Sequence, residues 1–234
     1  GRSLARRFAE RGDPLFLLGR DPAELARSAA DLAARSPEPS SVGTAHCDLE
    51  DLSDLEAALD AADAALGGFD TVVVTAGLYA TQSALEADDR LWQRLATVDF
   101  TNTIRFCEAV RRRLQSRGGG RLVVFSSVAG DRGRKPVGLY GAAKAGLSHY
   151  LESLDHRHRS SGLITTCVKP GFVRTEMTEG LKPPPFAGDP DDVSRRVLRA
   201  IDRGRPLVYA PAIWWAILTV IRCLPRFVMR RIEF

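Results

Sequence analysis

The sequence has few cysteines, and they lie far apart. No two of them form a Cys-x-x-Cys pair, and the four are Cys47, Cys107, Cys167 and Cys223. Isolated cysteines of this kind are typical of free thiols in a reducing compartment, which argues against a disulfide-built secreted fold and favours a cytoplasmic protein. The four histidines match no metal-ligand spacing, so we expect no metal site.

A long basic run and a membrane-spanning apolar run are also missing. The formal net charge is +4, but the arginines are spread along helical segments, so we expect no nucleic-acid partner. The apolar run from Ile213 to Ile221 is interrupted by Thr219 and is too short to cross a bilayer. The content of 44% apolar and 26% charged residues is ordinary for a globular α/β domain of this length.

Short apolar segments alternate with longer amphipathic segments along the chain. The pattern predicts strands at 14–18, 42–47, 71–75, 121–125, 163–168 and 207–209. It predicts helices at 1–12, 22–35, 54–66, 88–117 (in one or two pieces), 139–154 and 191–203, with loops at 36–41, 76–87 and 182–190. Such alternation predicts an α/β fold with a doubly wound parallel sheet in three layers, αβα. We expect one domain over 1–210 and an apolar, basic tail over 211–234.

The segment from Ser126 to Lys144 has the residue types of a proton-transfer site. Ser127 follows the strand at 121–125, and Tyr140 and Lys144 are four residues apart, on one face of the next predicted helix. An ammonium one turn away would lower the pKa of a tyrosine, and a serine hydroxyl could hold the substrate oxygen. A tyrosine and a lysine at this spacing are also common as a plain surface pair.

Several other polar or glycine residues come directly after predicted strands. They are Arg20, Asp48, Ala76-Gly77, Ser127 and Pro170-Gly171. Because ligands of open parallel sheets bind outside the carboxyl ends of the strands, we expect these residues to share one edge of the sheet. The glycines could equally be simple turn residues.

Taken together, these motifs resemble the short-chain dehydrogenase/reductase family, which has a Rossmann-type fold, over nearly the whole chain. Ser127, Tyr140 and Lys144 match the family's catalytic serine and Tyr-x-x-x-Lys pair. The segment Thr75-Ala76-Gly77 looks like its Asn-Asn-Ala-Gly motif with the asparagines replaced. The resemblance implies hydride transfer between a nicotinamide cofactor and a carbonyl or hydroxyl carbon, with a small-molecule or lipid-linked substrate.

The resemblance also implies a set of cofactor contacts. Asp48-Leu49 looks like the acidic adenine contact, and 170–175 looks like the Pro-Gly-x-Val-x-Thr segment that borders the nicotinamide. The implied contacts are Gly1, Arg20, Asp48, Leu49, Ala76, Gly77, Tyr140, Lys144, Pro170, Gly171, Val173 and Thr175. Gly1 would be the last glycine of the family's phosphate-binding loop, so we expect a chain that lacks the first, central strand and binds cofactor weakly.

Arg20 bears on the choice of cofactor. An acidic side chain at the end of the second strand would bind the ribose 2′-hydroxyl of NAD. Gly19 takes that place here, and the guanidinium of Arg20 suits a 2′-phosphate. We therefore expect NADP(H) to be preferred over NAD(H).

Asp99 departs from the family pattern. It stands in Val98-Asp99-Phe-Thr-Asn102, where the family usually has a catalytic asparagine. By this resemblance Asp99 is a candidate catalytic residue, although its charge could disturb the proton relay.

The tail from 211 to 234 is the least generic segment. Its tryptophans and arginines fit a helix in a membrane interface, and they also fit a substrate lid or a dimer-contact helix. The tail, together with Ser-Ser-x-Ala-Gly-x-Arg at 126–132 and Pro-Gly-x-Val-Arg-Thr-x-Met at 170–177, looks most like the family subgroup that includes the reductase of decaprenylphosphoryl-2-keto-ribose. This likeness implies a keto-sugar substrate on a lipid carrier and contact with the inner membrane face. A generic carbonyl reductase and a cofactor-binding protein without turnover stay open, and we expect a homo-oligomer.

Overall fold

The computed structural model describes residues 1–38, 41–184 and 186–232. The predicted loops at 36–41 and 182–190 and the tail at 211–234 each include residues outside these ranges.

The strands are those that the sequence predicts, and all of their pairings are parallel. Their bounds are β1 (Phe16–Gly19), β2 (Gly43–His46), β3 (Thr71–Val74), β4 (Gly120–Phe125), β5 (Leu163–Pro170) and β6 (Leu207–Ala210). They form two hydrogen-bonded groups, β1-β2 and β3-β4-β5-β6. In the part of the chain that the structure describes, the second edge of β1 and the second edge of β3 have no strand paired with them.

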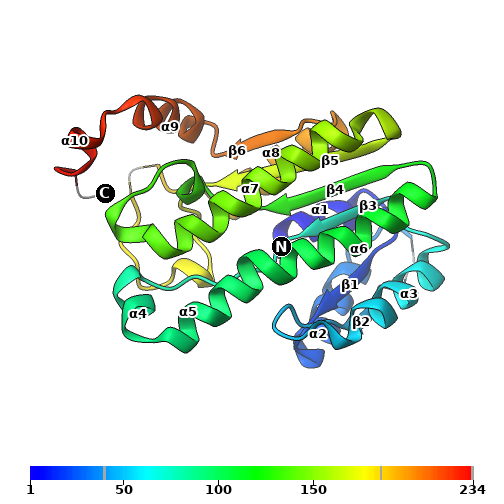
Figure 1. The fold of residues 1–234 in the computed structure, drawn as a ribbon. Helices are drawn as coiled ribbons and strands as arrows, with labels where there is room; N and C mark the ends of the chain where they lie inside the picture. The colour runs from blue at the N-terminus through cyan, green and yellow to red at the C-terminus, as the bar shows by residue number, and fades with distance from the viewer. Residues whose placement is uncertain (39–40, 185, 233–234) are drawn as a thin grey trace.

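Helices cover both faces of the strands, as the αβα prediction requires (Figure 1). The larger apolar core joins the strands to α3 (Leu55–Leu66), α6 (Asn102–Ser116) and α7 (Gly138–His158). The other core joins them to α1 (Arg2–Glu10) and α8 (Pro190–Asp202), and α2 (Pro22–Ala33) packs beside α1. Asp21 caps α2 through hydrogen bonds from two backbone amides, as its sequence position predicts.

The region between β3 and β4 differs from the prediction in one part and agrees in another. Residues 76–87 were expected to be a loop, but Thr81 caps a short helix, α4 (Gln82–Ala87). The helical region after it is in pieces, as one of the two alternatives predicts: α5 (Asp89–Ala96), a π-helical stretch (Thr97–Thr101) and α6. The π-helical stretch matters for the site because Asp99 lies in it.

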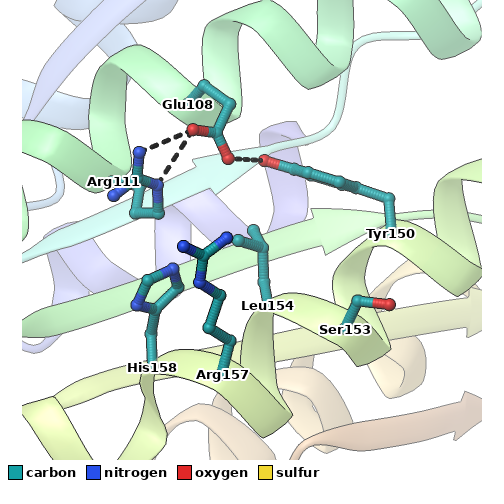
Figure 2. Close-up of a pocket in the computed structure, with 7 residues that line it drawn as sticks. All are labelled: Glu108, Arg111, Tyr150, Ser153, Leu154, Arg157 and His158. Carbon is teal, nitrogen blue, oxygen red and sulfur yellow. Dashed lines mark hydrogen bonds and ion pairs between the residues drawn. The ribbon is translucent and has the colours of Figure 1, made fainter.

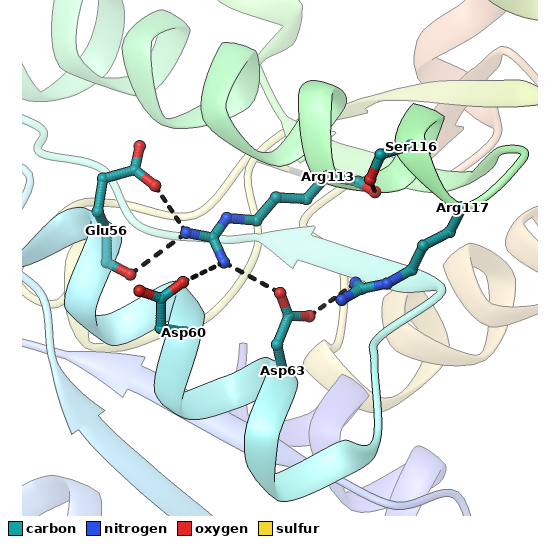
Figure 3. A network of polar contacts seen from close by, with 6 residues as sticks. All are labelled: Glu56, Asp60, Asp63, Arg113, Ser116 and Arg117. Carbon is teal, nitrogen blue, oxygen red and sulfur yellow. Dashed lines mark hydrogen bonds and ion pairs between the residues drawn. The ribbon is translucent and has the colours of Figure 1, made fainter.

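An arginine network fixes α3 against α6 (Figure 3). The guanidinium of Arg113 contacts the carboxylates of Glu56, Asp60 and Asp63, and Arg117 binds the second oxygen of Asp63. Burial acts to raise the pKa of Asp63, but the hydrogen bonds from Arg117 and Arg113 hold this pKa below its ordinary value. Glu56 and Asp60 are mostly exposed, so Asp63 is the partner that contributes most to stability.

The tail folds back onto the body of the domain. The helix α9 (Ile213–Cys223) packs through Leu218 and Ile221 against Val128 and Tyr209, and α10 (Arg226–Met229) follows it. Figure 1 shows both helices at the end of the molecule toward which β4, β5 and β6 point. Within the described residues no helix has the length and apolar content that crossing a bilayer requires.

Candidate active site

A 3₁₀ turn, Val128–Asp131, follows strand β4, and Ser127 is its N-terminal capping residue. Its Oγ accepts a hydrogen bond from the Ala129 amide at 3.1 Å, which leaves the hydroxyl hydrogen free to be donated. The Ser127 hydroxyl lies close enough to the Tyr140 side chain to act against the rise in the pKa of Tyr140. The structure therefore brings together the serine and tyrosine that the sequence places thirteen residues apart.

Tyr140 and Lys144 lie one turn apart on α7, on the face that meets the strand ends. The Nζ atom of Lys144 is 5.7 Å from the centroid of the Tyr140 ring, and only 4% of Lys144 is exposed. A surface pair would be solvated, so the plain surface interpretation of this spacing does not apply. A buried ammonium requires a counter-charge.

Asp99 supplies that counter-charge. It is fully buried, its Oδ1 accepts from the Leu78 amide at 2.7 Å, and its Oδ2 lies 3.3 Å from Lys144 Nζ. The second contact is an ion pair without hydrogen-bond geometry. Burial raises the pKa of Asp99, while Lys144 and the Leu78 amide oppose the rise. The residue that departs from the family pattern is thus the charge partner of the predicted catalytic lysine.

The expectation of a lowered tyrosine pKa is wrong for this structure. Burial raises the pKa of Tyr140, the negative charge of Asp99 and the neighbouring Tyr79 raise it further, and only the Ser127 hydroxyl opposes them. The positive charge of Lys144 is offset by Asp99 at 3.3 Å. The arrangement holds the phenol in its protonated form.

Gly77 has a specific steric reason for lacking a side chain. A Cβ there would come within 3.2 Å of Asp99 Oδ1 and 3.3 Å of Lys144 Nζ. The glycine therefore lets the chain after β3 pass directly over the buried ion pair, while Ala76 beside it is exposed. Sequence reasoning missed Tyr79 on the same segment, whose ring packs edge-on against Tyr140 with centroids 5.3 Å apart.

Arg20 lies at the end of β1, as predicted, but it has a partner. Its Nη1 is 3.0 Å from Glu50 Oε1, and Arg94 on α5 binds the same oxygen at 2.6 Å. Sequence reasoning missed Arg94 because it lies 74 positions from Arg20, on a helix whose position relative to β1 depends on the fold. The two guanidiniums form an exposed cationic pair bridged by one carboxylate.

The segment after β2 is held in place from two sides. Asp48 Oδ1 accepts from the Glu50 amide at 2.8 Å, and the Leu49 carbonyl accepts from the buried Asn102 side chain at 2.8 Å. The Leu49 side chain packs in the larger core. Across the sheet, Gly1 begins α1 against Thr75, since a Cβ on Gly1 would lie 2.7 Å from Thr75 Oγ1.

The segment after β5 packs against the tail. The indole of Trp214 lies directly on Gly171, where no side chain would fit, and Val173 bridges to Gly188. Pro170 ends β5, and Thr175 is exposed. Thr175 lies in the wall of an open cavity of about 440 Å³, with Phe172, Arg174, Thr178, Glu179, Leu181 and Pro183.

A second buried ion pair fixes the turn that bears Ser127. Asp131, at the far end of that turn, binds Lys169 of β5 through Oδ1 and the hydroxyl of Tyr209 of β6 through Oδ2, the latter at 2.7 Å. The Asp131 side chain is 2% exposed, and that of Lys169 is 12% exposed. Sequence reasoning missed this cluster, which joins the Ser127 turn to the strands that carry Pro170-Gly171 and the tail.

Another cavity lies away from these residues. A hollow of about 220 Å³ lies between α6 and α7. Glu108 there accepts hydrogen bonds from Arg111 and from the Tyr150 hydroxyl (Figure 2). None of the predicted site residues lines it. Its walls are Glu108, Arg111, Tyr150, Ser153, Leu154, Arg157 and His158.

The residues present fit a dinucleotide that carries a nicotinamide. A helix N-terminus and arginines are groups that hold phosphates, and the chain offers the N-terminus of α1 and the Arg20–Arg94 pair. Tyr140 and Lys144 offer a face that could hold a ribose. The buried indole nitrogen of Trp214, on Gly171, makes no hydrogen bond within the described residues, so a donor is free there.

Comparison with known proteins gives consistent results. The model of the short chain dehydrogenase family matches residues 1–185. An uncharacterized oxidoreductase of Mycobacterium tuberculosis is 33% identical over 231 residues, 99% of this chain and 92% of that protein. The 3-oxoacyl-[acyl-carrier-protein] reductase of Escherichia coli is 30% identical, over 66% of this chain and 60% of that protein. A short-chain dehydrogenase from Sphingobium yanoikuyae, solved with NADPH, superposes with a TM-score of 0.81 at 27% identity, over 100% of this chain and 92% of that one.

Proposed function

The chain belongs to the short-chain dehydrogenase/reductase family of oxidoreductases, and on that basis we propose that it transfers a hydride between NADP(H) and a carbonyl or hydroxyl carbon by Ser-Tyr-Lys catalysis. The observation that supports this most directly is the convergence of Ser127, Tyr140 and the buried Lys144 at the carboxyl ends of the strands. The nicotinamide, when bound, supplies or accepts the hydride.

Each of the three side chains has a role that follows from its contacts. Ser127, whose Oγ is already held by the Ala129 amide, donates its hydrogen to the substrate oxygen. Tyr140 gives that oxygen a proton in reduction and takes one in oxidation. Lys144 holds the cofactor ribose and offsets the phenolate that forms on Tyr140.

Asp99 bears on which form of Tyr140 is present at neutral pH. Because burial and Asp99 raise the pKa of Tyr140, the phenol is protonated at neutral pH, which is the form that donates a proton in reduction. We therefore propose that the protein works as a carbonyl reductase.

The test is oxidation of NADPH by the purified protein with a panel of ketones. Tyr140→Phe should lose at least about 100-fold in kcat, the usual size of a general acid's contribution, with cofactor binding kept. Tyr150→Phe, a tyrosine on the same helix beside the distant cavity, is the matched control and should keep its activity. Equal activity of Tyr140→Phe and the unmodified protein would refute the mechanism.

The preference for NADP(H) is supported by the two guanidiniums around Glu50. A 2′-phosphate offers Arg20 and Arg94 a stronger acceptor than one shared carboxylate. Arg20→Ala and Arg94→Ala should each weaken NADPH binding roughly tenfold and leave NADH binding nearly unchanged. Arg195→Ala, an exposed arginine on α8, is the control. An unchanged ratio of NADPH to NADH affinity would contradict the assignment.

For the substrate, we propose a keto-sugar on a lipid carrier, as in the subgroup that the sequence resembles. The apolar tail, which packs on Gly171 and on the Ser127 turn, supports a substrate with an apolar portion. Turnover of a lipid-linked ketose in detergent, compared with the same ketose without lipid, tests this. Equal kcat/KM for the two would favour a generic carbonyl reductase, and no turnover of any ketone with intact NADPH binding would favour a binding protein.

We also propose that the protein is a homo-oligomer. The half-buried Tyr150 and the cavity between α6 and α7 offer a surface that a second copy can cover. Light scattering after size-exclusion chromatography measures the mass directly. A monomer at all concentrations would exclude the proposal.

A further inference from the structure

The helix α9 has one face that is covered by the domain and one that is not. Trp214, Ile217, Leu218 and Ile221 turn inward and form a small core with Val128 and Tyr209. On the opposite side, 45% of Ile213, 58% of Trp215 and 64% of Val220 are exposed. The helix is therefore anchored on the domain and still presents large apolar side chains to solvent.

These exposed side chains are part of a concentrated apolar surface. Among the described residues, six of the seven exposed large apolar side chains belong to the tail or to the segment after β5; the exception is Leu207. The six are Met177, Phe186, Ile213, Trp215, Val220 and Phe227. The two segments are in contact, because Pro211 and Trp214 pack on Gly188 and Gly171. An exposed apolar group of this kind marks an interaction surface.

Arginines accompany the apolar residues. Arg222, Arg226, Arg230 and Arg231 are all exposed, and within the described residues none of them forms an ion pair. From 211 to 234 the sequence has one acidic residue, Glu233, against these four arginines. The surface therefore combines exposed aromatic and aliphatic side chains with an excess of positive charge on the tail.

We propose that the outer face of α9 and α10 docks on an anionic lipid surface. Aromatic and aliphatic side chains beside arginines are the composition of a helix that lies in a membrane interface, where the apolar groups enter the acyl boundary and the guanidiniums meet lipid phosphates. Charge complementarity selects this occupant over a second copy of the chain. A two-fold contact through this face would bring four arginines of each copy against one another.

Docking in this way would place the active-site mouth at the lipid surface. The inner face of α9 lies on Gly171 and on Val128, the residue after Ser127, so the outer face is one helix diameter from the catalytic turn. The proposal concerns binding and holds whether or not the protein turns over a lipid-linked substrate.

The experiment is flotation of the full chain with vesicles of phosphatidylcholine alone and of phosphatidylcholine mixed with phosphatidylglycerol. We expect binding to the mixed vesicles that falls as salt rises, and little binding to the neutral ones. Arg226→Glu and Arg230→Glu should each weaken binding by roughly fivefold or more, and Trp215→Ala with Phe227→Ala should abolish it. Leu207→Ala and Arg195→Glu, exposed residues of the same types elsewhere, are the matched controls.

Two results would overturn the proposal. One is no vesicle binding by the unmodified chain, or binding that the Arg226 and Arg230 variants leave unchanged. The other is a fall in molecular mass, measured by light scattering, for the Trp215→Ala, Phe227→Ala variant, since this would make the face a contact between copies. Circular dichroism melting confirms that each variant is folded, and activity on a water-soluble ketone should be unchanged in all of them.

Discussion

The charge of Asp99 should control the pH at which Tyr140 works as a base. The replacement Asp99→Asn keeps the shape of the side chain and its acceptor for the Leu78 amide, and it removes the negative charge. Burial and Asp99 together raise the pKa of Tyr140 in the unmodified protein. Without Asp99 the phenolate is easier to form, so alcohol oxidation should become fast at lower pH.

The size of this effect follows from two distances. Asp99 Oδ2 lies 3.3 Å from Lys144 Nζ, which lies 5.7 Å from the Tyr140 ring centroid, so the carboxylate is within about 9 Å of the ring. At an effective dielectric constant of about 20, two charges at that distance interact by about 2 kcal/mol. This energy corresponds to a shift of about one pH unit, and the freed charge of Lys144 acts in the same direction.

The assay is the initial rate of NADP⁺-dependent alcohol oxidation between pH ~6 and ~10. We expect the midpoint of the rising limb to move down by about one pH unit in Asp99→Asn. Asp192→Asn, the same change on an exposed part of α8, is the control and should not move it. A midpoint that stays in place, or moves up, in a folded Asp99→Asn protein would refute the electrostatic argument.

Three further predictions concern the stability of the fold and the support of the site. Arg113→Ala should lower the free energy of unfolding, measured by urea titration, by about 2 kcal/mol. It should also flatten the pH dependence of this free energy, because the pKa of Asp63 is lowered in the folded protein. The stability from that lowered pKa is present above the unfolded pKa and is lost as pH falls through the folded pKa. Asp131→Asn should reduce kcat more than it changes KM in steady-state assays, since it loosens the Ser127 turn from Lys169; a change in KM alone would contradict this. Gly77→Ala should lower stability by about 1–3 kcal/mol in thermal melts, because its Cβ would press on the Asp99–Lys144 pair, and an unchanged melting temperature would count against that contact.

Much of the architecture follows from local sequence pattern. The signals for these elements each lie within one segment of the chain, so the strands and most helices agree with prediction. They are apolar runs of four to six residues, glycines that end helices, and an Asp-Pro pair that begins one. The carboxyl ends of parallel strands share one edge, so the residues after those strands, Ser127 among them, could be placed near one another from the sequence alone. The short helix α4 was missed because its cap, Thr81, lies in a segment without strong periodicity.

The electrostatics of the site depended on tertiary structure. The sequence determines that Tyr140 and Lys144 share a helix face, because four residues make about one turn. It does not determine that Asp99, 45 positions before Lys144, meets the lysine at 3.3 Å, because that contact depends on how a π-helical stretch packs against α7. Three other features also depend on how distant segments pack. They are the pairing of Arg20 with Glu50 and Arg94, the Asp131–Lys169 pair and the inward face of α9. Local periodicity decides which face of an element is apolar, whereas the sign of a pKa shift depends on burial and on charges that distant segments bring close.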